Sequence, residues 1–160
     1  MSAAWHHEQT YADSCVAACM CIVQKARGEP ATETTFYRAG GLPPGQVMQL
    51  PRVRRIPSAA SEEEELVVAL GTGALLAVVS VLGSPYVRWQ ETAYPNLQSR
   101  FGRLARPGPH GGALHAIVLV GRVAGEFHAL DPHFPAHSPI RIDDDAFASF
   151  FGGHAYVAEP

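Results

Sequence analysis

The chain contains four residues whose types and order fit a thiol nucleophile site: Gln9, Cys15, His115 and Asp131. In such a site the cysteine attacks a carbonyl carbon as its thiolate, a histidine accepts and returns the proton, and a third group orients the histidine. One cysteine with a distant histidine is a weak signal, whereas four residues in this order are a stronger one. The sequence therefore predicts acyl-transfer chemistry with Cys15 as the nucleophile.

The residues around Cys15 have the pattern of a helix start. Asp13 or Ser14 can cap a helix beginning at about Cys15, apolar residues recur at helical spacing over 16–23, and Gly and Pro follow at 28–30. The N-terminus of a helix stabilises negative charge, so this position favours a thiolate. The alternative is that Cys15 is only a small buried hydrophobic residue, which the polar run before it makes less favourable.

The other two cysteines carry no comparable signal. Cys19 lies on the apolar stripe of the expected helix, so core packing is its favoured role, and Cys21 lies on another face. The Cys-x3-Cys-x-Cys spacing matches no common zinc site, so we expect neither a metal nor a cofactor. An odd number of cysteines within one helix also argues against a disulfide framework and for a reducing compartment.

Length and composition indicate one globular domain over residues 1–160. The chain has 47% hydrophobic residues and a net charge of −3, which is sufficient for a sizeable core and argues against nucleic acid as a partner. No apolar run approaches the ~18–20 residues of a membrane span. The N-terminal residues have no secretory pattern, so a cytoplasmic location is expected.

The order of the expected elements is an early helical half and a later strand half, which indicates an α+β fold. Helices are expected over 15–27, 32–37, about 61–70 behind a capping box at Ser61, and 143–151 capped by Asp143, with mostly loop over 42–60. Strands are expected over 74–82, 115–121, 126–130, 140–142 and 154–158. The second and third of these strands read as a hairpin.

With these residues in this order, the chain resembles the papain-like cysteine peptidases that remove double-glycine leader peptides from bacteriocin precursors. The resemblance covers nearly the whole chain, including the closing segment 142–160. It implies a papain-like fold, with an N-terminal nucleophile helix packed on a small antiparallel sheet. It also implies that Cys15 is the nucleophile, His115 the general base, Asp131 its orienting acid and Gln9 an oxyanion-hole residue.

The chain departs from that family in four places. Many members have Asp and Gly beside the cysteine, where this chain has Ser14 and Val16, and the usual Gly-marked long helix is missing. Residues 83–113 form an insertion before the histidine strand, and no transporter follows, so a free-standing peptidase is expected. These departures leave the expected fold unchanged and leave the substrate open.

The insertion is expected to be a long loop beside the cleft that contacts the substrate. Its basic and aromatic side chains are typical of a recognition surface, and the ones expected to bind substrate are Trp89, Arg100, Arg103 and Arg106. Tyr86, Tyr94 and Phe101 lie among them. The positive charge predicts a preference for acidic segments, such as an acidic leader peptide. A surface excursion without function is the alternative.

Three function classes remain open on the sequence alone. The first is a peptidase that cuts a peptide after small residues such as Gly-Gly, and the second is a papain-like effector or toxin protease. The third is an acyltransferase or a peptide-binding module on the same fold. Among the other histidines, His128 and His133 could line the cleft, and His110 is the substitute base if His115 lies away from Cys15.

Overall fold

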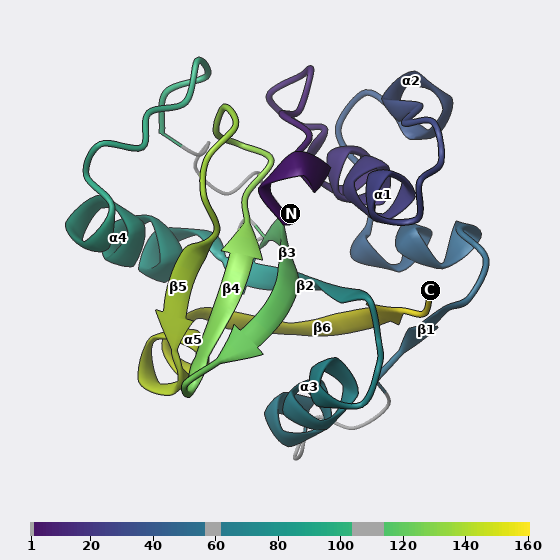
Figure 1. The fold of residues 1–160 in the computed structure, drawn as a ribbon. Coiled ribbons are helices and arrows are strands. Elements are labelled where there is room, and N and C mark those ends of the chain that lie inside the picture. The colour runs from purple at the N-terminus through teal and green to yellow at the C-terminus, as the bar shows by residue number, and fades with distance from the viewer. Residues whose placement is uncertain (1, 57–61, 104–113) are drawn as a thin grey trace.

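A six-stranded antiparallel sheet forms the centre of the computed structural model, which describes residues 2–56, 62–103 and 114–160. The strand order is β1-β6-β2-β3-β4-β5. The bounds are β1 Val53–Arg55, β2 Leu76–Leu82, β3 Leu114–Val123, β4 Glu126–Leu130, β5 Ile140–Asp143 and β6 Phe151–Ala158. Figure 1 shows that the sheet is strongly twisted, so that β6 and β2 cross the direction of β3, β4 and β5.

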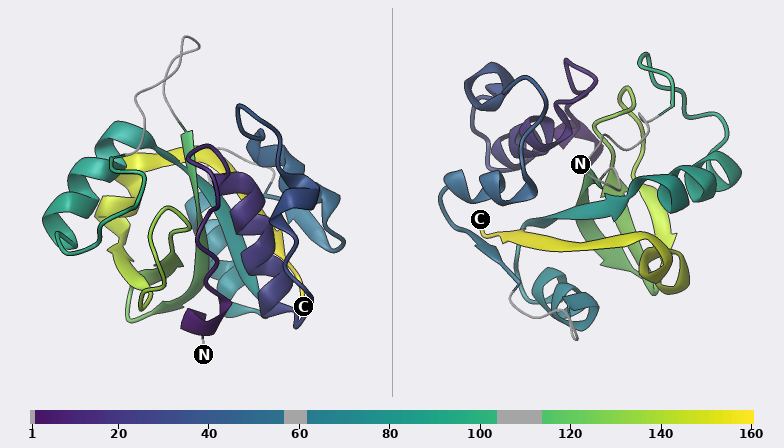
Figure 2. Two further views of the ribbon diagram at one scale, coloured as in Figure 1. Left: turned by 90° about the horizontal axis from the view of Figure 1, so that it is seen from above. Right: turned by 180° about the vertical axis from the view of Figure 1, so that it is seen from behind.

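Helices cover both faces of this sheet. The α-helices are α1 Cys15–Ala26, α2 Glu33–Phe36, α3 Glu62–Gly71, α4 Gly83–Ala93 and α5 Asp144–Phe150, and the short 3-10 helices are η1 Ser2–Trp5 and η2 Pro44–Gln49. Helices α1 and α2 lie together on one side, while α3, α4 and α5 lie on the other side of the sheet (Figures 1 and 2). The fold is therefore α+β, as the order of elements predicts.

Each face of the sheet has its own hydrophobic core, and β2 contributes to both. Leu76 and Val78 pack with α1 residues such as Met20, whereas Ala77 and Val79 pack in the second core with residues of α3, α4 and α5. Successive side chains of a strand point to opposite faces, so a strand between two covered faces must be apolar throughout. This explains why every residue of β2 except Ser80 is apolar.

The hairpin β3–β4 brings distant residues to one edge of the sheet. Its turn consists of Ala124 and Gly125, both with positive φ (53° and 79°), which is the backbone of a tight two-residue hairpin turn. The strands pair antiparallel from Val123–Glu126 to Val118–Leu130. The start of β3, with His115, and the end of β4, just before Asp131, consequently lie at the same end.

Most expected elements are confirmed. Helix α1, the short helix at 33–36, the strands β2 to β6 and the helix after Asp143 all occur close to their expected bounds. The cap at Asp143 is also confirmed, because its carboxylate accepts a hydrogen bond of 2.8 Å from the Ala146 amide. The expected capping residue Ser61 lies outside the described residues.

Two expectations about loops are wrong. Residues 53–55 were expected to be loop but form edge strand β1, which pairs with β6. The first part of the expected insertion loop is helix α4, which buries Tyr86, Val87 and Gln90 on one side. Pro85 lies in its first turn, where a missing amide hydrogen is tolerated. Residues 104–113, the remainder of the expected insertion, lie outside the described residues.

Candidate active site

Cys15 is the first residue of α1 and is partly exposed. Ser14 occupies the N-cap position, as expected, but makes no capping bond. Its hydroxyl accepts a hydrogen bond from the Tyr11 amide (3.0 Å) and donates one to the Tyr11 carbonyl (2.9 Å). The expected cap by the Ser14 side chain is therefore wrong. Cys15 therefore lies in the first turn of α1, where the positive end of the helix dipole favours negative charge.

His115 lies at the start of β3 with only 4% of its surface exposed. Its Nε2 is 2.7 Å from Oδ1 of Asp131, the first residue after β4, and Asp131 is completely buried. Nε2 must carry the proton in this bond, because a carboxylate can only accept. Nδ1 is then the ring nitrogen left to exchange a proton with Cys15.

Charge is stabilised on both members of this pair. Burial lowers the pKa of His115, but the Asp131 carboxylate and then the hydrogen bond to the Cys15 sulfur and its charge outweigh it and raise the pKa to about 10. Burial raises the pKa of Asp131, but His115, the Tyr86 hydroxyl and the His133 amide together lower it to about 2. At neutral pH the pair is consequently an imidazolium beside a carboxylate, and an imidazolium next to Cys15 stabilises a thiolate.

A cleft of about 250 Å³ opens at Cys15 and His115. Small residues make up much of its wall, including three glycines and two alanines: Gly40, Gly41, Gly83, Ala12 and Ala116. Cys15 and His115 therefore line a space whose other walls carry few long side chains.

The glycine wall is held in place by Asp13. Its carboxylate accepts hydrogen bonds from the Tyr37 hydroxyl (2.8 Å) and the Gly40 amide (2.7 Å). Gly41 has a φ of 86°, and a Cβ there would lie 3.0 Å from the Asp13 carbonyl oxygen. Gly41 is therefore required both by its backbone conformation and by this close approach. Asp13 acts here as an anchor of the cleft and not as a helix cap.

Gln9 is fully buried near the start of α1. Its amide nitrogen donates to the carbonyls of Tyr11 (2.8 Å) and Ala12 (3.1 Å), and its backbone amide donates to the Pro132 carbonyl (2.8 Å). Gln9 thus connects the segment before Cys15 to the segment after Asp131. Both donors of its side chain are engaged, so an oxyanion could bind only by replacing one carbonyl, and the oxyanion-hole role stays a prediction.

Replacing Gln9 by alanine is expected to lower kcat about 10²–10³-fold with little change in KM, because an oxyanion donor acts mainly in the transition state. The measurement is steady-state kinetics on a cleavable peptide, with Gln24→Ala in α1 as the matched control. Since Gln9 also supports the backbone at 11–12, thermal unfolding should accompany the kinetics. Unchanged turnover in a folded Gln9→Ala variant would assign the oxyanion to other donors.

The residues expected to bind substrate make contacts within the protein. Trp89 packs between the rings of Tyr86, Phe150 and Tyr94, at centroid distances of 5.4–6.1 Å. Arg100 donates to the backbone carbonyls of Gln9 (2.8 Å) and Thr10 (3.0 Å). Arg100 therefore supports the backbone beside the candidate site, and its role in substrate binding stays a prediction.

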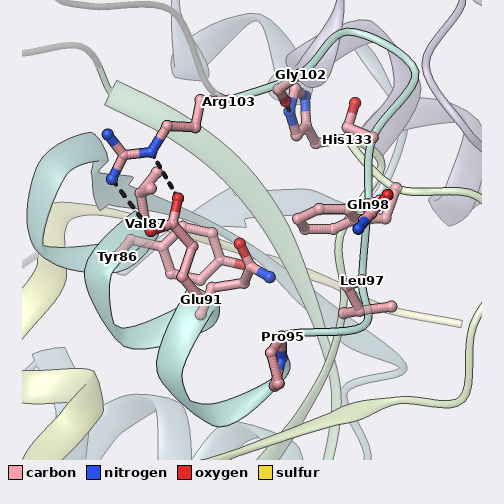
Figure 3. A pocket seen from close by; sticks show the side chains of 12 residues that line it. Tyr86, Val87, Glu91, Pro95, Leu97, Gln98, Gly102, Arg103 and His133 are labelled. Atoms are coloured by element: carbon pink, nitrogen blue, oxygen red, sulfur yellow. Dashed lines mark hydrogen bonds and ion pairs between the residues drawn. The ribbon is translucent and has the colours of Figure 1, made fainter.

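Arg103 and Arg106, the other two arginines expected to bind substrate, differ from Arg100 in their contacts. Arg103 is largely exposed and donates to both carboxylate oxygens of Glu91 of α4, from Nε at 2.5 Å and from one Nη at 3.1 Å (Figure 3). Its positive charge is therefore already compensated in the free protein. Arg106 lies outside the described residues, as does the substitute base His110. A role for Arg103 and Arg106 in substrate binding stays a prediction.

Two residues contact Asp131 in a way that the sequence did not predict: Tyr86, which was not expected at the site, and His133, which was named only as a residue that could line the cleft. The Tyr86 hydroxyl donates to Oδ2 of Asp131 at 2.5 Å, and the His133 amide donates to Oδ1 at 2.9 Å. Tyr86 was expected among exposed aromatic residues of a loop, and this is wrong because α4 buries it to 1% exposure. No local pattern connects residues 86 and 131, so only the tertiary structure shows the contact.

Neither a metal site nor a membrane-spanning helix is found among the described residues. Within 2–56, 62–103 and 114–160, no group of three or more His, Cys, Asp or Glu side chains is placed to hold a metal ion. No helix in those ranges is long and apolar enough to cross a membrane.

Solved structures share this architecture. The peptidase domain of Streptococcus ComA, a bifunctional ABC transporter involved in a quorum-sensing pathway, superposes with a TM-score of 0.61 at 15% identity, covering 96% of this chain and 97% of that one. A protein from Bacillus anthracis described as a C39-like peptidase gives a TM-score of 0.64 at 14% identity, covering 98% and 94%. The chain has the papain-like fold of these peptidase domains. No protein-family model matches the sequence, and no curated protein matches it.

The complex of the Streptococcus mutans ComA peptidase domain with a small-molecule inhibitor also shares the fold. It gives a TM-score of 0.54 at 14% identity and covers 95% of this chain and 97% of that one. In each case nearly the whole of both chains is matched.

Proposed function

We propose that the protein is a cysteine peptidase with Cys15, His115 and Asp131 as its catalytic residues. The observation that carries the proposal is the buried His115–Asp131 pair, joined at 2.7 Å, beside a cysteine that begins a helix. Burying an imidazole and a carboxylate is costly unless they are paired. Their placement against a partly exposed thiol in a cleft is the arrangement that activates a nucleophile. The shared fold with peptidase domains supports the same conclusion.

The reaction begins when the Cys15 thiolate attacks the carbonyl carbon of a peptide bond. The His115 imidazolium gives its proton to the nitrogen of the departing amine, which leaves an acyl group joined to sulfur as a thioester. His115 then removes a proton from water, whose oxygen attacks the thioester. The carbon–sulfur bond then breaks, the carboxylic acid product leaves, and His115 keeps the proton taken from water beside the regenerated Cys15 thiolate, which restores the starting ion pair. Asp131 keeps the imidazole oriented throughout.

The substrate in this proposal is a peptide cut after small residues, as in removal of a leader that ends in Gly-Gly. The support is the cleft, where Gly40, Gly41 and Gly83 lie beside Cys15 and His115. Such walls allow close approach of a peptide backbone. A mass-spectrometric profile of the products from a peptide library tests this. Cleavage after Gly or Ala is the expected result, and cleavage only after large residues contradicts it.

The same experiment separates the peptidase from an acyltransferase. A peptidase transfers the acyl group to water and releases a free carboxylate, whereas an acyltransferase joins it to an added amine in preference. Including a primary amine in the library reaction and weighing the products decides between the two. Products dominated by the amide would replace hydrolysis by transfer as the activity.

For Arg103, opposite effects are expected from two substitutions on one ion pair. Arg103→Ala should raise KM for an acidic peptide about 3- to 10-fold at low salt, by loss of one charge interaction, and Glu91→Ala should lower it by freeing Arg103. Both differences should disappear near 1 M salt, where the screening length is about 3 Å. Arg88→Ala on the exposed side of α4 is the control. Equal KM values for all three variants would exclude Arg103 from substrate recognition.

A further inference from the structure

Tyr86 of helix α4 lies next to the candidate active site and contacts Asp131. Tyr86 is 1% exposed and its hydroxyl donates to Oδ2 of Asp131 at 2.5 Å. Both groups are buried, so water does not compete for this bond. A hydrogen bond from a neutral donor to a buried carboxylate is short and strong. The bond therefore joins a residue of the expected insertion directly to the carboxylate that orients His115.

The two oxygens of Asp131 have separate tasks. Oδ1 accepts from Nε2 of His115 (2.7 Å) and from the His133 amide (2.9 Å), whereas Oδ2 accepts from Tyr86. Hydrogen bonds to both oxygens fix the orientation of the carboxylate plane. A bond to one oxygen alone would leave the carboxylate free to rotate about its Cβ–Cγ bond. The phenol also draws negative charge towards Oδ2. It therefore moderates how strongly Oδ1 holds the imidazolium proton.

The position of Tyr86 is fixed by its surroundings. Its ring packs edge-on against Phe150 of α5 at 5.2 Å and lies 5.9 Å from the His115 ring. On its other side it lines a cavity of about 300 Å³ together with Val87 and His133 (Figure 3). Burial and the nearby Asp131 charge raise the pKa of Tyr86 well above its ordinary value. The phenol consequently remains a donor at neutral pH.

We infer that Tyr86 is a positioning residue for the candidate catalytic triad, orienting Asp131 and tempering its charge through the bond to Oδ2. This inference rests on the proposed function, because it concerns the same site. It gives helix α4 a role in catalysis that is distinct from substrate recognition. Tyr86 acts through Asp131 and His115 and does not touch the reacting atoms.

Several titratable groups surround Asp131, and a pH profile reports all of them. Those that interact with Asp131 or with its partner His115 are His6 after η1, Cys15 and Cys19 of α1, Tyr86 of α4, His115 of β3, and His133 and His137 after β4. Only Tyr86 and His115 hydrogen-bond to the carboxylate through their side chains among the described residues. A substitution at Tyr86 therefore acts first on the His115–Asp131 pair.

The test compares Tyr86→Phe with Tyr94→Phe. Tyr94 lies just after α4, and its hydroxyl accepts a hydrogen bond from the Arg141 amide (2.7 Å), away from the candidate site. Tyr86→Phe is expected to lower kcat about tenfold, which corresponds to one hydrogen bond to a charged group, with KM unchanged. Tyr94→Phe should leave both constants unchanged. Equal kinetics of the two variants overturn the inference.

The pH profile provides a readout that a purely structural role would not move. Without the phenol, Asp131 loses a donor that favours its charged form, so its pKa rises and the acid limb of kcat/KM moves to higher pH. The carboxylate then holds the imidazolium proton more firmly, and the alkaline limb also moves to higher pH. A fluorinated tyrosine at position 86, whose phenol is more acidic, should move both limbs the other way. The inference is overturned if both limbs of the kcat/KM profile stay at their wild-type pH in these variants.

Alkylation of Cys15 by iodoacetamide separates this inference from the proposed function. Its rate depends on the thiolate and its imidazolium, whether or not the protein cleaves peptides. If the wild type cleaves nothing but Tyr86→Phe alters the pH dependence of alkylation, the proposed function fails and the positioning role stands. In an Asp131→Ala background, Tyr86→Phe should have no further effect. Additive effects there, or a Tyr86→Phe variant that alkylates as the wild type does, overturn the inference.

Discussion

Cys15→Ala is expected to abolish peptide cleavage, with a loss on the order of 10⁶-fold, because removing a catalytic nucleophile leaves only the binding contributions. The partly exposed thiol is the one nucleophile placed in the described cleft beside His115. The fold should survive, since the substitution removes one sulfur atom at a helix start. Cleavage assays together with a thermal unfolding curve check both statements. Activity retained in a protein free of wild-type contamination would remove Cys15 from the mechanism.

Selective alkylation checks the same assignment without a substrate. Cys19 and Cys21 are completely buried. Burial raises the pKa of Cys19 well above its ordinary value and that of Cys21 to about 12, so neither forms a thiolate at neutral pH. Iodoacetamide should therefore label Cys15 alone in the folded protein and all three thiols in denaturant. Cys21→Ala is the control and should keep full activity, whereas first labelling at Cys21 would contradict the assignment.

The position of the candidate site was predictable because local patterns determine its parts. Helical spacing over 16–23 and the stop signals after it place Cys15 at the start of α1. The apolar runs around Ala124 and Gly125 predict a hairpin, and a two-residue turn brings His115 and Asp131 to one end of it. Two periodicities and one turn therefore suffice to bring the histidine and aspartate together.

The contacts of α4 were not predictable from the sequence in the same way. Residues 83–93 contain Gly83, Pro85 and few apolar residues, so their periodicity does not distinguish a helix from a loop. The helix forms because Tyr86 fills a space against α5 and bonds to Asp131, which is 45 residues away in the sequence. A contact of this kind is decided by tertiary packing, which overrides local propensity.

Arg100 shows the same limit for a charged residue. Its sequence context indicates an exposed cation for binding an acidic substrate, but its guanidinium donates to the carbonyls of Gln9 and Thr10. Amino-acid composition shows that a positive charge is present. It does not show which carbonyl groups the guanidinium contacts in the folded protein. Arg100 lies 91 residues after Gln9 in the sequence, so no local pattern relates them.

His115→Ala is expected to remove activity and also to destabilise the fold by about 3–5 kcal/mol, because it leaves the buried Asp131 carboxylate without its cationic partner. Asp131→Ala should reduce kcat less, since Asp131 orients the imidazole and does not transfer the proton. The double variant His115→Ala/Asp131→Ala should be more stable than the sum of the single effects, because it removes the unpaired charge. His128→Ala on β4, a partly exposed histidine, should change stability by less than about 0.5 kcal/mol.

The pKa shifts of Asp131 and His115 determine how the stability of the wild type changes with pH. In the wild type, the pKa of Asp131 is lowered to about 2 and that of His115 is raised to about 10. The Asp131 contribution to stability is therefore present above its unfolded pKa and is lost as the pH falls through about 2. The His115 contribution is complete below its unfolded pKa and is lost as the pH rises through about 10. Both contributions operate between about pH 4 and 6.5, so wild-type stability should be highest there.

In His115→Ala the buried Asp131 carboxyl instead favours its protonated form, because burial is no longer opposed by a cation. The deficit in stability relative to the wild type should then be larger at pH 7 than at pH 4, where protonation removes the unpaired charge. Urea unfolding of both proteins at the two pH values measures this difference directly. A deficit that is equal at pH 4 and pH 7 would mean that Asp131 is not held as a buried anion by His115, and the charged pair would have to be replaced by a neutral one.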